Sequence, residues 1–113
     1  MIKDVVRLNS LYDYYGDLLS ENQRMSFYYY YILDYSLTEI SEEIGISKQG
    51  ISENLKRATK ELENYESVLN LFNKNDKIRN SIEDMKNIIK DLNKEDRIKM
   101  EVLIQDIVKE LDD

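Results

Sequence analysis

Residues 36–62 read "SLTEISEEIGISKQGISENLKRATKEL" and decide the fold of this chain. Ser36 is followed three residues later by Glu39, which is the capping-box spacing that begins a helix. Gly45 suits the end of that helix, and Ser47 suits the N-cap of a longer one. A short helix, a turn that contains glycine and a longer helix with a polar N-terminal half predict a helix–turn–helix motif.

The longer helix of this motif has an apolar side and a polar side. Its inner stripe consists of Ile51, Leu55, Ala58, Leu62, Tyr65 and Leu69. Its outer side carries Lys48, Gln49, Ser52, Lys56 and Lys60, with Arg57 near the margin. In a major groove about 12 Å wide, glutamine can bond adenine through two hydrogen bonds, and lysine can reach guanine or phosphate. A plain helical hairpin with a solvated face would show the same pattern, so the target stays open.

The motif is a basic segment in an acidic chain. The 113 residues carry a net charge of −7, which argues against a protein that coats nucleic acid without specificity. Residues 46–62 carry four basic and two acidic groups, whereas the segments on either side carry net charges of −5 and −4. Glu39, Glu42, Glu43 and Glu53 would oppose a phosphate backbone. The charges therefore favour a protein partner or a structured site over bulk duplex DNA.

The tyrosine-rich stretch "SFYYYYILDYS", residues 26–36, allows two interpretations. Ser20 and Gln23 have capping-box spacing, so we expect a helix from Glu21 to about Leu33 that carries the tyrosines. Met25, Tyr28, Tyr29 and Ile32 would share one face of it. Base-stacking platforms have cations between the aromatic residues, but residues 25–33 contain no Lys or Arg. The pattern therefore favours a core or oligomer contact over base stacking.

Helical patterns also flank the motif on both sides. A stripe predicts a first helix from Asp4 to about Tyr14, which Gly16 would end in a left-handed conformation. Beyond residue 72, apolar residues again recur at helical spacing, and Asn93 with Asp96 could begin a further helix. Two antiparallel helices or one bent helix would fit. We expect a helix–turn–helix domain at residues 1–72 and a helical extension at 73–113 that packs on the domain or forms a homodimer.

Composition narrows the class of protein. The chain has no proline and three glycines, which favours an all-α fold over a sandwich or barrel. It has no cysteine and no histidine, which removes disulfides, imidazole bases, cysteine nucleophiles and the usual zinc ligands. We expect no enzyme activity, no cofactor and no metal. No apolar run approaches the roughly 18–20 residues of a membrane helix, and the N-terminus "MIKDVVRLNS" does not look like a signal peptide. The expected location is the cytoplasm.

Residues 19–62 resemble the C-terminal promoter-reading region of bacterial sigma factors, through the pattern L-x-x-x-QR and the segment "SLTEISEEIGIS". A longer resemblance, over residues 1 to about 72, is to the YlxM family of small bacterial helix–turn–helix proteins. It rests on "RLNSLYDYYGDLLSENQR", the pair Tyr30 and Tyr31, "SLTEISEEIGISKQGISENLKR" and "LENYESVL". The lead "LYDYYGDLL" separates the chain from sigma factors, which have no such segment.

The resemblance to YlxM implies a fold like sigma region 4, of the winged-helix-like DNA-binding type without a wing, followed by a helical extension. It also implies a regulatory role in or on the signal recognition particle pathway, because YlxM proteins are typically encoded beside components of that pathway. The partner would then be the particle's GTPase, its RNA or the ribosome. The alternative is a sequence-specific DNA-binding transcription regulator. A third reading is a structural protein that recruits another protein. No catalytic residues carry over.

The resemblance also indicates which positions would contact the target. These are Ser47, Lys48, Gln49, Ser52, Glu53, Lys56, Arg57 and Lys60. Gly50 departs from an easy DNA-binding helix, because glycine weakens a helix by up to about 1 kcal/mol relative to alanine. Close packing against the turn would explain a glycine at this position.

Overall fold

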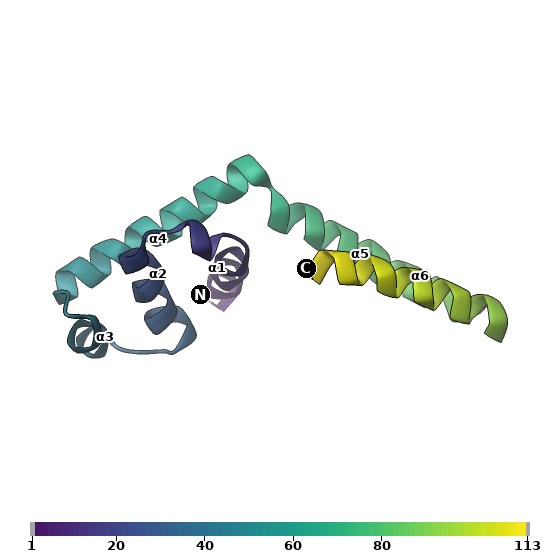
Figure 1. Ribbon diagram of the computed structural model, residues 1–113, viewed down its shortest axis with the longest axis horizontal. Coiled ribbons are helices and arrows are strands. Elements are labelled where there is room, and N and C mark those ends of the chain that lie inside the picture. Colours follow the sequence, from purple (N-terminus) through teal and green to yellow (C-terminus); the bar gives the residue numbers. More distant parts are fainter. Residues whose placement is uncertain (1, 113) are drawn as a thin grey trace. The chain divides into compact units, whose positions relative to one another are not determined.

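The computed structural model describes residues 2–112, and its regular elements in this range are all helical. The α-helices are α1 (Ile2–Tyr15), α2 (Glu21–Phe27), α3 (Leu37–Ile44), α4 (Lys48–Leu69), α5 (Leu71–Ile89) and α6 (Lys94–Asp112) (Figure 1). A 3-10 turn, Gly16–Leu18, follows α1, and a π-helical turn, Tyr28–Ile32, follows α2. The predicted all-α class is confirmed. In residues 2–112, no helix is both long and apolar enough to cross a membrane.

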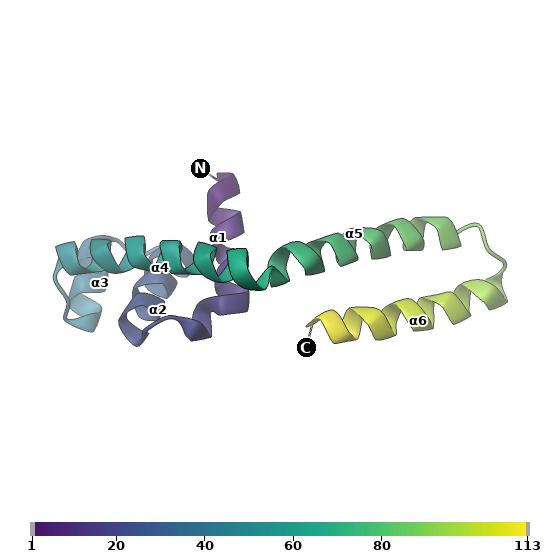
Figure 2. The same ribbon diagram turned by 90° about the horizontal axis from the view of Figure 1, so that it is seen from above.

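The chain divides into two compact units between Phe72 and Asn73. In the first unit, α1, α2 and α3 all pack on α4 (Figure 1). In the second unit, α5 and α6 run antiparallel and a short turn joins them (Figure 2). Of the two arrangements left open by the sequence, the C-terminal segment therefore adopts the pair of helices.

The turn between α3 and α4 forms as the sequence predicts. The Ser36 hydroxyl accepts a hydrogen bond from the Glu39 amide at 3.1 Å, and the Glu39 carboxylate accepts one from the Ser36 amide at 3.0 Å. Gly45 ends α3 in the left-handed conformation with φ of 72°, where a side chain would be strained. The Ser47 hydroxyl then accepts from the Gly50 amide at 3.0 Å and begins α4. The helix–turn–helix prediction is confirmed.

Gly50 lies in the first turn of α4 because nothing larger fits there. A Cβ atom at this position would lie 2.7 Å from Cγ2 of Ile46 and 3.2 Å from the Ser47 hydroxyl oxygen. Ile46 is half-buried and packs against the cluster formed by Ile40 and Ile51. Gly50 thus allows α4 to approach the turn closely, which agrees with the close packing predicted from the sequence.

Replacing Gly50 with alanine is expected to destabilise the protein by about 1 kcal/mol. Alanine gains up to about 1 kcal/mol in helix propensity, but overpacking a well-filled site costs about 1–3 kcal/mol. Urea denaturation measures the difference. In an Ile46→Ala background the 2.7 Å contact with Cγ2 is gone, so there Gly50→Ala should be less destabilising than in the unmodified protein. A stabilising effect in the unmodified protein would contradict this explanation.

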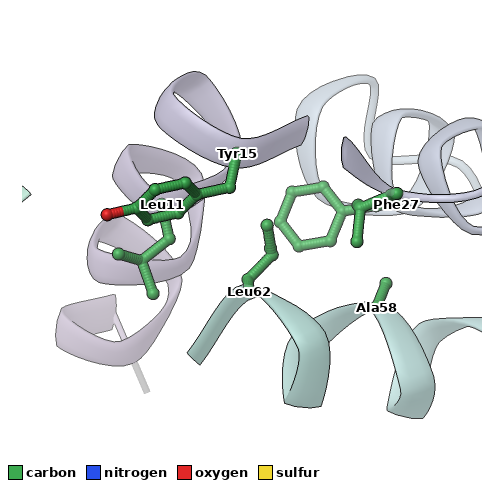
Figure 3. Packing of buried hydrophobic residues seen from close by; sticks show 6 residues of the cluster. Leu11, Tyr15, Phe27, Ala58 and Leu62 are labelled. Carbon is green, nitrogen blue, oxygen red and sulfur yellow. The ribbon is translucent and has the colours of Figure 1, made fainter. Parts of the chain in front are cut away.

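Two apolar clusters hold the first unit together. The larger joins α1, α2 and α4 and consists of Leu11, Tyr15, Leu19, Phe27, Ala58 and Leu62 (Figure 3). The smaller consists of Ile40, Ile51 and Leu55 and fixes α3 on the first half of α4. Because α4 contributes to both clusters, burial of its inner stripe determines which of its side chains face outward. Leu69 is exposed, so the predicted inner stripe is wrong at this position.

The tyrosine-rich segment is part of the packing, but its faces differ from those expected. Phe27 is fully buried and stacks on Tyr12 with ring centroids 4.6 Å apart, whereas Tyr28 and Ile32 are exposed. Tyr31 packs against both clusters and Tyr29 against the smaller one. The regular helix ends at Phe27, and the π-helical turn that follows changes the angular positions of the later residues.

Gly16 does not have the left-handed conformation that was expected of it. Of the three glycines, only Gly45 has a positive φ. Gly16 is buried at the start of the 3-10 turn, and a Cβ atom there would lie 3.0 Å from Cε1 of Tyr12. A close approach to the Tyr12 ring, rather than backbone handedness, therefore accounts for this glycine.

A buried carboxylate near the end of α4 forms hydrogen bonds to α1 and to the start of α5. The Glu66 side chain is only 5% exposed, and its Oε1 accepts hydrogen bonds from the Tyr15 hydroxyl at 2.6 Å and the Phe72 amide at 3.1 Å. The Tyr15 oxygen in turn accepts from the Leu71 amide at 3.0 Å. Asn70, with φ of 55°, allows the chain to turn at this point. Glu66 and Tyr15 thus satisfy the first two amides of α5, which have no partner within that helix.

Candidate nucleic-acid or partner interface

The outer side of α4 presents a continuous polar stripe. Gln49, Glu53, Lys56 and Lys60 follow one another at steps of four, three and four residues, and all four are exposed. At a rise of 1.5 Å per residue the stripe is about 17 Å long. This length corresponds to about five base steps of a nucleic-acid strand. The stripe is thus long enough to contact several successive nucleotides or a comparable protein surface.

The other predicted contact residues lie around this stripe with different roles. Lys48 is exposed at the first position of α4, and Arg57 is exposed beside Lys56 at the margin of the stripe. Ser52 is half-buried, so only part of its surface is available. Ser47 is exposed, but its hydroxyl already accepts the hydrogen bond that begins α4. The structure thus presents most of the predicted set on one side of one helix.

The cations of this surface have no anionic partner within the part of the chain that the structure describes. No ion pair involves Lys48, Lys56, Arg57 or Lys60 among residues 2–112. Glu53 is the one acidic residue on the stripe itself. A cluster of cations without ion pairs can bind an anionic target without first breaking contacts inside the protein.

Of the acidic residues of α3, one takes part in the helix cap and two are exposed. Glu39 is held by the capping box, and the hydrogen bond from the Ser36 amide lowers the pKa of its carboxyl. Glu42 and Glu43 are exposed on the same helix. Their charge would disfavour a close approach of phosphates along α3, so an anionic target would have to be contacted through α4.

The packing beneath the stripe holds α4 in a fixed position. Ile51, Ala58 and Leu62 are fully buried on the opposite side of the helix. Between them, the Asn54 side chain donates a hydrogen bond to the buried Ser26 hydroxyl at 3.4 Å and so links α4 to α2. The sequence pattern did not identify Asn54 or Ser26, because a pair separated by 28 residues leaves no periodic signal. Rigid support of this kind favours a recognition surface.

Arg7, a cation outside the stripe, forms an ion pair with Glu63. The Arg7 guanidinium donates two hydrogen bonds of 2.9 Å to the Glu63 carboxylate and lies 5.8 Å from the centre of the Phe72 ring. These bonds lower the pKa of Glu63 and raise that of Arg7. The pair therefore links α1 to the C-terminal half of α4, one helical turn beyond Lys60.

Stability is expected to fall slightly as the pH drops below about 4.5, the usual pKa of a glutamate. Because the folded-state pKa of Glu63 is lowered, the unfolded chain takes up the proton first, so the pair stabilises the fold above that pH and is lost below it. An exposed pair contributes about 0–1 kcal/mol. Urea midpoints measured from pH 7 to pH 3 test this, and Glu63→Gln should show a shallower dependence. An equally steep dependence in that variant would contradict the assignment.

Comparison with known proteins gives a consistent result over the whole chain. A family model described as "Putative helix-turn-helix protein, YlxM / p13 like" (UPF0122) matches residues 2–106. A UPF0122 protein of Thermoanaerobacter sp. (strain X514) is 39% identical over 115 residues, covering 100% of this chain and 97% of the relative. A UPF0122 protein of Geobacillus sp. (strain WCH70) is 35% identical over 113 residues, covering 100% and 98%. One from Caldanaerobacter subterraneus is 46% identical over 89 residues, covering 79% and 76%.

Proposed function

The chain belongs to the UPF0122 family of YlxM- and p13-like helix–turn–helix proteins, and on that premise we propose that it regulates the signal recognition particle pathway by binding one of its components through α4. The contact surface would be the stripe of Gln49, Glu53, Lys56 and Lys60 with Arg57 beside it. The protein would act in the cytosol and by binding alone, with no catalytic step. The pathway assignment rests on the resemblance to YlxM proteins.

One observation carries the choice of surface. The cations on α4 are exposed on one side of one helix and have no ion pair within residues 2–112, although the chain as a whole carries a charge of −7. Elsewhere in the first unit, Arg7 is tied to Glu63. A concentration of free positive charge supports a phosphate-bearing or acidic target. The acidic residues in the rest of the chain would repel an anionic target, and this repulsion would limit its contact to α4.

A sequence-specific DNA-binding regulator is the second candidate. Helix–turn–helix proteins read bases with the N-terminal part of the second helix. This candidate is supported because Gln49 is exposed in the first turn of α4, with Lys56 and Lys60 further along the same side.

An RNA target would be contacted differently from duplex DNA. The major groove of A-form RNA is too deep and narrow for such a helix, so an RNA target would be bound through phosphates or single-stranded loops.

A capture experiment distinguishes these candidates. Purified protein at physiological salt is tested against three immobilised targets: the particle's GTPase, its RNA and a random duplex DNA pool carried through selection. Capture by the GTPase or the RNA is expected. Enrichment of a DNA motif without capture by the particle would instead make the protein a transcription regulator. Capture by none of the three would leave both candidates without support.

The salt dependence of binding is expected to separate a nucleic-acid contact from a protein contact. If the four cations of α4 each contact a phosphate of a duplex, the logarithm of affinity should fall with the logarithm of salt concentration with a slope of about −3 to −4. A flat response would indicate a largely protein–protein interface. Titrations between about 50 and 200 mM salt measure the slope.

A further inference from the structure

The hairpin of α5 and α6 buries little of its apolar surface within itself. Its buried core is Ile82, Ile89 and Ile104, and Met85, Met100, Val108 and Leu111 pack around it. Large apolar side chains remain exposed, among them Ile88 at 71% and Leu103 at 56%. A pair of short helices is marginal on its own and usually gains its stability from further packing. The exposed apolar residues are therefore a feature to be explained.

Most of these exposed residues lie on one side of the hairpin. Successive residues of an α-helix are about 100° apart, so with Ile104 directed at α5, Leu103 and Ile107 lie on the same flank of α6. On α5, Ile88 and Ile78 lie to one side of the line from Ile82 to Ile89. Because the helices are antiparallel, these two flanks belong to the same face of the hairpin. We call it the apolar face; it comprises Ile78, Met85, Ile88, Met100, Leu103 and Ile107.

The opposite face of the hairpin is more polar, although Ile98 and Val102 are exposed on that flank of α6. Shallow pockets between the two helices are lined there by Ile82, Ile89, Ile104 and Val108 together with charged and amide side chains. These include Arg79, Glu83, Lys86, Lys90, Glu101 and Gln105. A difference of this kind between the two faces is expected of a helix pair that is covered on one side only.

We propose that the apolar face is covered by the same face of a second copy of the chain, so that two hairpins form a four-helix bundle. Helices of 19 residues are about 28 Å long, and two packed side by side are about 20 Å wide. Pairing two such faces removes about 1,100 Å² from solvent, close to the lower limit for a specific interface. Burial of Leu103, Ile107 and Ile88 at its centre supplies the driving force.

Charged residues of the apolar face fit a second copy, because Lys77 and Glu110 lie on the same sides of α5 and α6 as Ile88 and Leu103. Lys77 lies in the first half of α5 and Asp84 in the second half, and Glu110 lies near the end of α6. If the twofold axis places α5 against the partner's α5, Lys77 lies near the partner's Asp84. If the axis places α5 against the partner's α6, Lys77 lies near the partner's Glu110. Residues 73–113 carry nine basic and eleven acidic groups, so repulsion between two hairpins is weak. The charges of the face therefore allow it to pair with a second copy of itself.

Light scattering on the full-length protein tests this inference. Over about 1 to 100 µM, the unmodified chain should have twice the monomer mass of 13.5 kDa. Leu103→Glu/Ile107→Glu places two charges in the apolar face and should return the mass to 13.5 kDa. Light scattering measures the mass of this variant even if the substitutions disrupt the helices of the hairpin. Leu103→Ser/Ile107→Ser, without added charge, should also weaken the dimer.

A matched control lies on the same helix. The side chains of Ile98 and Val102 are 48% and 57% exposed, which is similar to the 43% and 56% of Ile107 and Leu103. They lie, however, on the other flank of α6. Ile98→Glu/Val102→Glu should therefore leave the dimer intact. A monomeric unmodified protein throughout this concentration range would overturn the inference. Equal loss of the dimer in both glutamate variants would overturn it as well.

Discussion

Replacing Lys56 and Arg57 with glutamate is expected to reduce binding to the target at least a hundredfold without changing the fold. Both side chains are exposed and make no ion pair within the described residues, so they contribute little to stability. If each forms one charge-assisted hydrogen bond worth about 1.5–3 kcal/mol, losing both costs roughly 3 kcal/mol or more. Repulsion by the new carboxylates adds to this loss. Affinity is measured on whichever of the three immobilised targets captures the unmodified protein.

The control for this variant changes the net charge equally at another place. Lys94→Glu/Lys109→Glu alters two exposed residues of α6 that lie on its other flank from Leu103, and both double variants shift the net charge from −7 to −11. The control should bind within a few fold of the unmodified protein. Circular dichroism of the Lys56→Glu/Arg57→Glu variant should be unchanged. Loss of helix in that variant would mean that the two residues do not lie on the outer side of α4, and equal loss of binding in both variants would mean that overall charge decides affinity.

Replacing Glu66 with leucine is expected to destabilise the first unit by about 3 kcal/mol. Leucine has a similar volume, but it leaves the Tyr15 hydroxyl and the Phe72 amide without their acceptor. Leaving a buried donor unsatisfied costs about 1–3 kcal/mol, and two donors are affected here. The free energy of unfolding from urea denaturation is the measurement.

Glu66→Gln provides the matched comparison. The amide oxygen of glutamine can still accept from Tyr15 and Phe72, so most of the stability should be retained. Tyr15→Phe removes the hydroxyl that donates to Glu66 and accepts from Leu71, and it should lie between the other two variants. If Glu66→Leu were as stable as the unmodified protein, the hydrogen bonds at the end of α4 would not be important for the fold.

The local signals of the sequence predicted the helix–turn–helix accurately, because each depends on residues close together in the chain. Ser36, Glu39, Gly45 and Ser47 act at fixed offsets, and each has the predicted role in the structure. The exposed side of α4 follows in the same way from the period of its inner stripe. The family assignment predicted from the residue pattern is likewise confirmed by the match over residues 2–106.

Features that depend on distant residues were not predictable from the same patterns. The burial of Glu66 depends on Tyr15, which lies 51 residues away, and a carboxylate among apolar residues would normally be placed outside. The faces of the tyrosine segment depend on a π-helical turn that has no residue signature in "YYYY". In the candidate site, Ser52 is half-buried and the Ser47 hydroxyl already accepts the capping hydrogen bond, so both residues have less surface or fewer hydrogen bonds available for a partner.

The central claim is that the outer side of α4 is the surface that binds the target. Nuclear magnetic resonance tests it most directly, by titrating labelled protein with whichever of the three immobilised targets captured it. The prediction is that the largest chemical-shift changes fall on Gln49, Glu53, Lys56, Arg57 and Lys60. Changes confined to the hairpin of α5 and α6, with α4 unaffected, would contradict the claim.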